Sequence, residues 1–266
     1  MKKSLLMALF FIPPALRAGD IALYYLNNAA LEWEGTGYRD NPSGWELKAK
    51  PEADALAFRW RQPVAQDLYT QVFYVRNKPY YSFENGNTAD STHQQTGETR
   101  MTFNEVSADL RRPLEDSSFG VMVGGQGVSQ TFNRKDVLFG GTPTSSTVRE
   151  ALGALGGYIG VYTLGLPPAK GRGYYWDMES FIGHYFWTQN TVKDYEGSMH
   201  RNGFFYAARL EAGWQAGQMR LGAGWLRQEL EIIVPAGKAL PNGATASLPD
   251  NKTDFSSPFI SVTYAY

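Results

Sequence analysis

Residues 203–214 decide the fold, and they are GFFYAARLEAGW. Apolar side chains occupy the even positions from Phe204 to Trp214, whereas Arg209 and Glu211 fall on odd positions. Successive side chains of a β-strand point to opposite faces, so a period of two residues gives one apolar face and one charged face. The stretch therefore predicts a long β-strand with two chemically different faces.

The same period recurs along the whole chain, and no helical period persists for more than about two turns. Many of the expected strands reach the roughly 9 to 11 residues that a tilted strand needs to cross a bilayer. They also exceed the usual strand length in globular sheets, which is about five or six residues. We expect ten strands, at residues 31–38, 54–62, 68–83, 98–110, 119–132, 151–164, 174–190, 203–214, 219–234 and 255–266.

The connections between these strands alternate in length. The short ones are residues 63–67, 111–118, 165–173 and 215–218. The long, polar ones are residues 39–53, 84–97, 133–150, 191–202 and 235–254. A soluble β-sandwich also alternates apolar and polar residues, but it has no reason to gather every long loop at one end. The alternation of lengths favours a membrane barrel.

Composition excludes several other classes. The 266 residues are 43% hydrophobic and 14% aromatic, with no cysteine and a net charge of −1. Without cysteine, disulfide scaffolds and thiolate metal sites are excluded. The net charge also shows no excess of basic residues that would attract nucleic acid. No segment approaches the roughly 18 apolar residues of a spanning helix. Residues 1–18 have the charged start and apolar stretch of a secretory signal, so residues 19–266 are expected to form one mature domain.

Three stretches depart from simple alternation. Residues 98–110 switch parity, which predicts a bulge near Asn104 and Glu105. Because glycine has no side chain, four glycines in residues 151–164 are expected to let neighbouring groups inside the barrel approach this strand closely. Arg227, Glu229 and Glu231 are expected on the same outward face as the apolar residues earlier in their strand. We therefore expect this part of the strand to lie outside the hydrocarbon layer of the membrane.

The chain ends on alternating apolar and aromatic residues, Ile260, Val262, Tyr264 and Tyr266, and other aromatic residues gather near strand ends. In these features it resembles the Gram-negative outer-membrane β-barrel proteins. The resemblance implies an antiparallel up-and-down transmembrane barrel of about ten strands, within a range of 8 to 12, with short periplasmic turns and long extracellular loops. It also implies outer-membrane location after signal cleavage, contact with membrane lipid, and recognition of the C-terminal residues by the barrel-insertion machinery.

The inward face is expected to carry nearly balanced charges. Acids on some strands face bases on others, with Glu32 and Glu34 placed beside Arg59 and Arg61. Such pairs brace and fill a narrow barrel, or line a small, weakly selective pore. The predicted lumen network is Glu32, Glu34, Arg59, Arg61, Arg76, Arg100, Asp177, Glu179, Arg209, Glu211 and Arg220.

Three functions remain open. The first is a narrow passive pore for small solutes or ions; the second is a structural barrel, or one that binds a surface ligand through its loops. The third and weakest is an outer-membrane hydrolase. His93 and His200 lie near carboxylates, but the stretch from His200 to Gly203 lacks the serine of the phospholipase motif that it faintly resembles. No catalytic, cofactor or metal site is expected, and His184 is expected at the membrane interface.

Overall fold

The structure is a computed structural model of the whole chain. The residues that it describes are 19–36, 45–49, 52–65, 68–77, 80–88, 94–115, 117–139, 142–143, 148–163, 171–192, 202–233, 238–239, 245–246 and 250–266. The predicted signal segment, His93 and His200 lie outside these residues.

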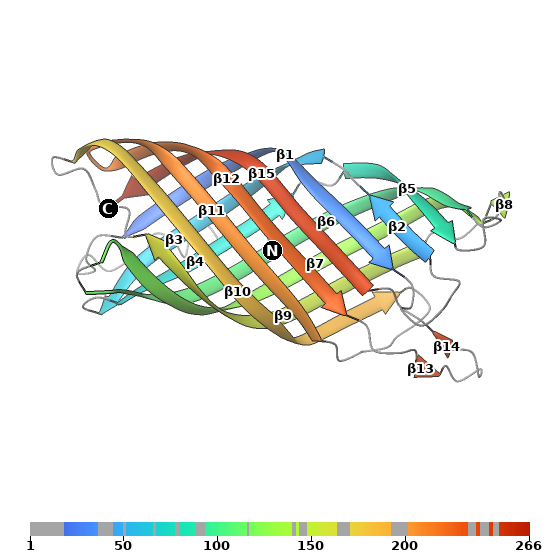
Figure 1. Cartoon of the computed structure of the whole chain (residues 1–266). Coiled ribbons are helices and arrows are strands. Elements are labelled where there is room, and N and C mark those ends of the chain that lie inside the picture. The colour runs from blue at the N-terminus through green and yellow to red at the C-terminus, as the bar shows by residue number, and fades with distance from the viewer. Residues whose placement is uncertain are drawn as a thin grey trace, which may run out of the picture.

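Ten long strands form the wall of the molecule (Figure 1). They are β1 (Asp20–Thr36), β3 (Glu52–Ala65), β4 (Leu68–Asn77), β6 (Gln94–Pro113), β7 (Phe119–Phe139), β9 (Val148–Thr163), β10 (Arg172–Val192), β11 (Asn202–Ala216), β12 (Met219–Ile233) and β15 (Asp250–Ala265). The shorter strands are β2 (Trp45–Ala49), β5 (Tyr80–Thr88), β8 (Thr142–Pro143), β13 (Lys238–Ala239) and β14 (Thr245–Ala246).

Every long strand pairs antiparallel with two others, and β1 closes the circle by pairing with β15. The closure leaves no open edge, because Ile21 stands opposite Tyr264 and Trp60 on its two neighbours. The prediction of a closed antiparallel barrel of ten strands is confirmed. Within the described ranges, the chain has no helix long and apolar enough to cross a membrane.

The strand connections alternate as predicted. At one end, which we call the short-turn end, β3 joins β4 after Ala65 and β11 joins β12 through residues 217–218. The first and last strand residues of the wall, Asp20 and Ala265, pair with each other at this end, where Figure 1 marks the C-terminus. The opposite end, the long-loop end, carries the short strands β2, β5, β8, β13 and β14.

Two expectations about strands were wrong. Strand β1 begins at Asp20 rather than at residue 31, and β6 runs through Asn104 and Glu105 without a bulge. At the start of β1 the side chains are apolar on both faces, with Leu23 outside and Tyr24 and Leu26 inside. A strand between hydrocarbon and an apolar interior shows no period of two, so sequence alone did not recognise it. In β6 the two faces change character instead: the inner face changes from the buried Phe103 to the buried Glu105, and the outer face changes from Asn104 to the exposed Val106. Sequence alone mistook this change for a register shift.

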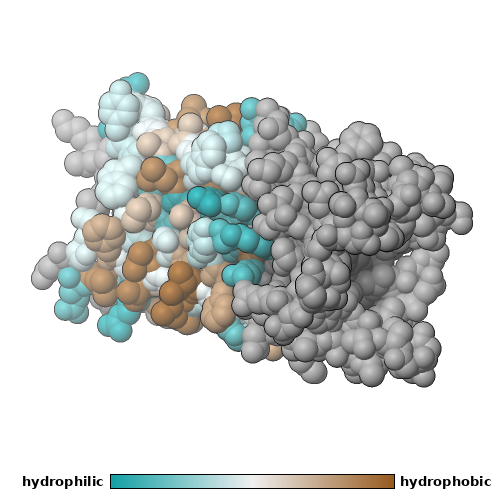
Figure 2. Space-filling model, turned by 45° about the vertical axis from the view of Figure 1, so that its right-hand side comes forward, coloured by the Kyte–Doolittle hydropathy of each residue, from teal (hydrophilic) through white to brown (hydrophobic). Residues whose placement is uncertain are grey.

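The outer face is apolar over the described wall. Ile182 is 64% exposed and Ile159 is 63% exposed, as expected of side chains that face acyl tails rather than water. Figure 2 shows apolar side chains at the surface of the described part. Tyr174 and Trp214 stack edge to face near the short-turn end, where an aromatic girdle is expected. Other exposed apolar residues are Leu23, Leu56, Val123, Leu210, Leu221, Ile260 and Val262.

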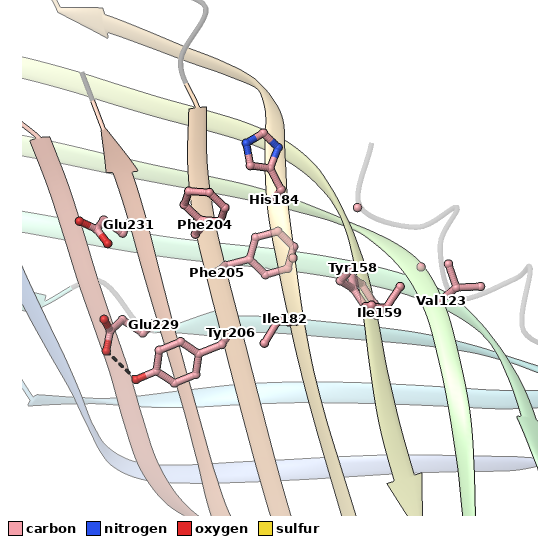
Figure 3. Close-up of a pocket in the computed structure, with 13 residues that line it drawn as sticks. Val123, Tyr158, Ile159, Ile182, His184, Phe204, Phe205, Tyr206, Glu229 and Glu231 are labelled. Atoms are coloured by element: carbon pink, nitrogen blue, oxygen red, sulfur yellow. Dashed lines mark hydrogen bonds between the residues drawn. The ribbon is translucent and has the colours of Figure 1, made fainter. Parts of the chain in front are cut away.

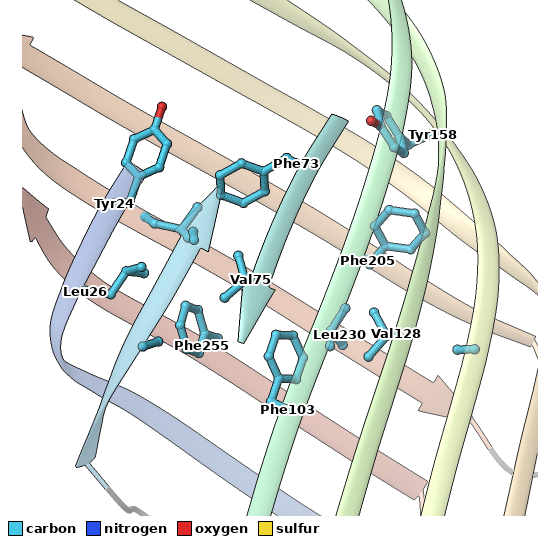
Figure 4. Packing of buried hydrophobic residues seen from close by; sticks show 14 of the residues in the cluster. Tyr24, Leu26, Phe73, Val75, Phe103, Val128, Tyr158, Phe205, Leu230 and Phe255 are labelled. Carbon is cyan, nitrogen blue, oxygen red and sulfur yellow. The ribbon is translucent and has the colours of Figure 1, made fainter. Parts of the chain in front are cut away.

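The interior has a second apolar region, toward the long-loop end. Leu26, Val75 and Phe103 are fully buried there, and the rings of Phe103 and Phe255 stack at 5.5 Å between centroids. In Figure 4 these side chains project from different strands into the space enclosed by the wall. The barrel is therefore packed like a protein core over this part of its length.

Candidate functional site: the barrel interior

An ion pair crosses the barrel near the short-turn end. Arg59 on β3 and Asp177 on β10 lie five strands apart in the circle of ten, which is the greatest separation possible. Their side chains nevertheless meet, with 3.5 Å between Arg59 Nη1 and Asp177 Oδ2. Arg59 Nη2 also donates a hydrogen bond to Asp20 Oδ1 at 3.2 Å. The lumen is therefore occupied across its full width at this level.

Arg209 joins several carboxylates on one side of this crossing. Its guanidinium lies 2.9 Å from Glu179 Oε1, 3.4 Å from Asp177 Oδ2 and 3.4 Å from Glu211 Oε2. It also donates a hydrogen bond to the Tyr24 hydroxyl across the lumen. Because one guanidinium has five N–H donors in a rigid plane, it can bind several acceptors at once.

Arg111 extends the same network to β6. It pairs with Asp109 at 2.6 Å and with Glu179 at 2.8 Å, and its guanidinium lies 5.1 Å from the centre of the Tyr162 ring. The Tyr158 hydroxyl donates to Asp109 at 2.9 Å. We call the whole set the charge layer: Asp20, Arg59, Arg61, Asp109, Arg111, Asp177, Glu179, Arg209 and Glu211.

A second crossing lies nearer the long-loop end. Gln130 on β7 and Thr253 on β15 are also five strands apart, and Gln130 Nε2 donates to Thr253 Oγ1 at 3.1 Å. Between the two crossings, a hollow of about 10 Å³ beside Gln71 and Glu105 has room for no more than about one water molecule. The described interior is therefore filled at two levels.

The structure brings together six of the predicted lumen residues. Arg59, Asp177, Glu179, Arg209 and Glu211 are buried in the charge layer, and Arg61 pairs with Asp20 at 3.7 Å and with Asp177 at 3.6 Å. Arg220 stands apart from this layer: it donates to Gln215 at 2.8 Å and lies over the Tyr175 ring.

Other members of the predicted network were misplaced. Arg76 is exposed on the outer face, because the parity of β4 turns Val75 inward and Arg76 outward. Glu32 and Glu34 pair along β1 with Asp254 and Lys252 of β15, so they do not stand beside Arg59 and Arg61. The side chains of Glu32, Glu34 and Arg100 lie outside the described set.

Sequence reasoning missed Asp20, Asp109 and Arg111. Asp20 stands opposite Arg61, in a part of β1 that was not recognised as a strand. Asp109 and Arg111 occupy the same alternate positions of β6 as the inward-facing Met101 and Phe103, which would have placed them in the lumen. The predicted bulge reversed that assignment. The glycine prediction was half right: a side chain on Gly156 or Gly160 would clash with inner neighbours, whereas Gly153 and Gly157 face outward.

The described residues carry little that resembles a catalytic centre. His184 is exposed on the outer wall, with its ring 5.1 Å from that of Phe204. Within the described part of the chain, no three His, Asp or Glu side chains are grouped so that they could hold a metal ion. Ile260, Val262 and Tyr264 face outward, and the Tyr266 hydroxyl donates to Gln62 at 2.6 Å and accepts from Trp60 at 3.0 Å.

Comparison with known proteins supports the architecture. No protein-family model matches the sequence, and no curated protein is similar to it in sequence. The outer membrane protease OmpT from Escherichia coli has a similar structure, with a TM-score of 0.65 at 8% identity over 96% of this chain and 99% of that one. At that identity the likeness concerns the fold alone.

Two further structures align with lower scores. The transport unit of the autotransporter AIDA-I from Escherichia coli has a TM-score of 0.38 at 8% identity, over 97% of this chain and 94% of its own. The COG4313 outer membrane channel from Pseudomonas putida F1 has a TM-score of 0.33 at 10% identity, over 96% and 97%. The closed ten-strand wall, its apolar outer face and its structural likeness to OmpT together give this chain the fold of the Gram-negative outer-membrane β-barrel proteins.

Proposed function

We propose that the chain is a sealed outer-membrane barrel that serves as a rigid scaffold for its long loops, and that it does not conduct solutes passively. The observation that carries the proposal is the contact between Arg59 and Asp177, which joins opposite walls of the barrel. Loops held on a rigid scaffold are the usual place for binding residues, so a surface ligand is the expected partner.

Opening the charge layer would be costly. Arg59 and Arg209 have side chains that are 2% exposed, so a passing solute would have to separate buried charges from their partners. Leaving one buried partner unpaired costs roughly 3 to 5 kcal/mol. A solute would then meet the second crossing at Gln130 and the packed rings of Phe103 and Phe255. The packing of the interior therefore favours the interpretation that these charges fill the lumen over the interpretation that they select ions in an open pore.

Reconstitution in planar bilayers tests the proposal. The full chain, purified as a folded barrel and checked by heat-modifiable gel migration, is expected to give no discrete conductance steps. A known porin reconstituted under the same conditions provides the positive control. Discrete single-channel steps from this chain that change in size in the Arg59→Ala variant would overturn the sealed scaffold in favour of the pore.

Ligand capture tests the loop half of the proposal. Deleting residues 238–248 at the long-loop end should abolish binding of a surface ligand while leaving heat-modifiable migration unchanged. Full retention of capture by a correctly folded deletion variant would exclude this segment as the binding element.

A further inference from the structure

One buried carboxylate takes part in none of the ion pairs of the described residues. Glu105 on β6 is 3% exposed, and its Oε2 atom has no hydrogen-bond partner within the described part of the chain. A carboxylate on the outer wall provides the contrast. Glu229, beside an outer groove of about 730 Å³, accepts a hydrogen bond from Tyr206 at 2.6 Å (Figure 3) and pairs with Lys252 at 3.0 Å. Glu105 is more deeply buried and has no such cation.

Glu105 lines the small hollow of about 10 Å³ between the two crossings. The charged groups that share this hollow are Asp109, Arg111, Glu179 and Arg209. Arg111 pairs with Asp109 at 2.6 Å and with Glu179 at 2.8 Å, and Arg209 pairs with Glu179 at 2.9 Å. These guanidiniums belong to the charge layer, whose arginines do not outnumber its carboxylates. The lining of the hollow therefore carries one negative charge more than its cations balance.

The other strands around Glu105 present neutral groups to it. The amides of Gln126 on β7 and Gln228 on β12 face its carboxyl, and the Nε2 atoms of both amides have no partner among the described residues. Gln71 on β4 lines the hollow as well. The titratable Tyr185 on β10 uses its hydroxyl to donate to Gln126 Oε1 at 3.1 Å. Glu105 is thus surrounded by amides and by cations that already have partners.

An ionised carboxylate that is buried without a counter-ion is so unfavourable that the group is neutralised instead. A metal cation or a proton can neutralise it. Hard metal cations need several oxygen ligands, whereas the unpartnered atoms facing Glu105 are amide nitrogens, which are hydrogen-bond donors. A protonated carboxyl needs no further ligand, and it still accepts hydrogen bonds from such donors. The geometry therefore favours the proton.

We propose that Glu105 is a proton-binding site that makes the seal of the barrel depend on pH. The folded chain holds a proton on Glu105, and loss of that proton to alkaline solution leaves a buried anion that draws water into the hollow. Because the hollow has room for about one water molecule, hydration of the anion must separate the side chains around it. The inference rests on the proposed sealed barrel, and it names the condition under which the seal loosens.

Infrared spectroscopy of the folded full chain in detergent detects the proton directly. At a pH of about 6 an ordinary glutamate is ionised, so the carbonyl band of a protonated carboxylic acid reports a buried one. The unmodified chain is expected to show this band and Glu105→Gln to lack it, while Glu115→Gln, changed in an exposed turn, retains it. Equal spectra of the unmodified chain and Glu105→Gln in this region would mean that Glu105 is ionised beside a cation, and would overturn the proposal.

Thiol labelling tests the loosening of the seal. Ser107→Cys places a thiol at the hollow, and Ser118→Cys places one in an exposed short turn. The ratio of their labelling rates by a charged reagent, taken at one pH, cancels the ordinary gain in thiol reactivity with pH. This ratio is expected to rise at least tenfold between a pH of about 6 and a pH of about 9, and to stay low when Glu105→Gln is also present.

The outcomes separate this inference from the proposed function. Prompt labelling of Ser107→Cys at both pH values would mean that the lumen is open, and it would overturn both proposals. Protection at both pH values would keep the seal and overturn the proton site, as would an equal rise of the ratio with and without Glu105→Gln. Heat-modifiable migration of every variant at each pH shows that labelling does not come from unfolded chains.

Discussion

At the scale of single residues, the direction of a side chain decides whether a charge matters to stability. Arg209 is buried among three carboxylates and the Tyr24 hydroxyl, while Arg76 is exposed on the outer wall. A buried ion pair broken on one side leaves uncompensated charge, whereas an exposed cation contributes little. Arg209 and Arg76 belong to the same predicted network, but only Arg209 is expected to contribute strongly to the stability of the barrel.

Arg209→Ala is accordingly expected to lower the free energy of unfolding by about 3 to 5 kcal/mol. The matched variant Arg76→Ala should change it by less than about 0.5 kcal/mol. Urea unfolding of the barrel in detergent, followed by heat-modifiable migration, measures both values. Similar losses for the two variants would contradict the positions that the structure gives them.

At the scale of the strands, close approach of neighbouring backbones constrains particular glycines. An added Cβ on Gly213 of β11 would clash with the Leu221 carbonyl oxygen of β12, and a backbone atom cannot move aside cheaply. A Cβ on Gly125 of β7 would lie 3.5 Å from its nearest neighbour, which is ordinary contact. The spacing of the strands therefore requires glycine at position 213 but leaves room for a Cβ at position 125.

Gly213→Ala should thus destabilise the barrel by about 1 to 3 kcal/mol, as overpacking does, while Gly125→Ala should be nearly neutral. The comparison of their urea midpoints provides the measurement. A midpoint for Gly213→Ala equal to that of the unmodified chain would mean that β11 and β12 are farther apart than described.

The strands also show how far sequence could predict this fold. Alternation located β11 and β10 well, because there the inner face is charged and the outer face apolar. It failed at the start of β1, where Leu23 faces outward and Tyr24 and Leu26 face an apolar interior. The contact between Arg59 and Asp177 could not be predicted, because it depends on which strands stand opposite once the circle closes.

At the scale of the whole molecule, the barrel has an apolar exterior and an interior filled by two crossings. The space between them is the best place to test whether water enters. Ser107 lies there, buried beside the small hollow near Glu105. The natural chain has no cysteine, so a single introduced thiol reports on its own surroundings without interference.

The most direct measurement is therefore the labelling rate of Ser107→Cys by a charged, water-soluble thiol reagent, with Ser118→Cys in an exposed short turn as the control. The sealed barrel predicts that Ser118→Cys reacts promptly, and that Ser107→Cys reacts only after the barrel is unfolded by heat. Prompt labelling of Ser107→Cys in the folded protein would show that water reaches the lumen between the crossings, and it would contradict a filled interior.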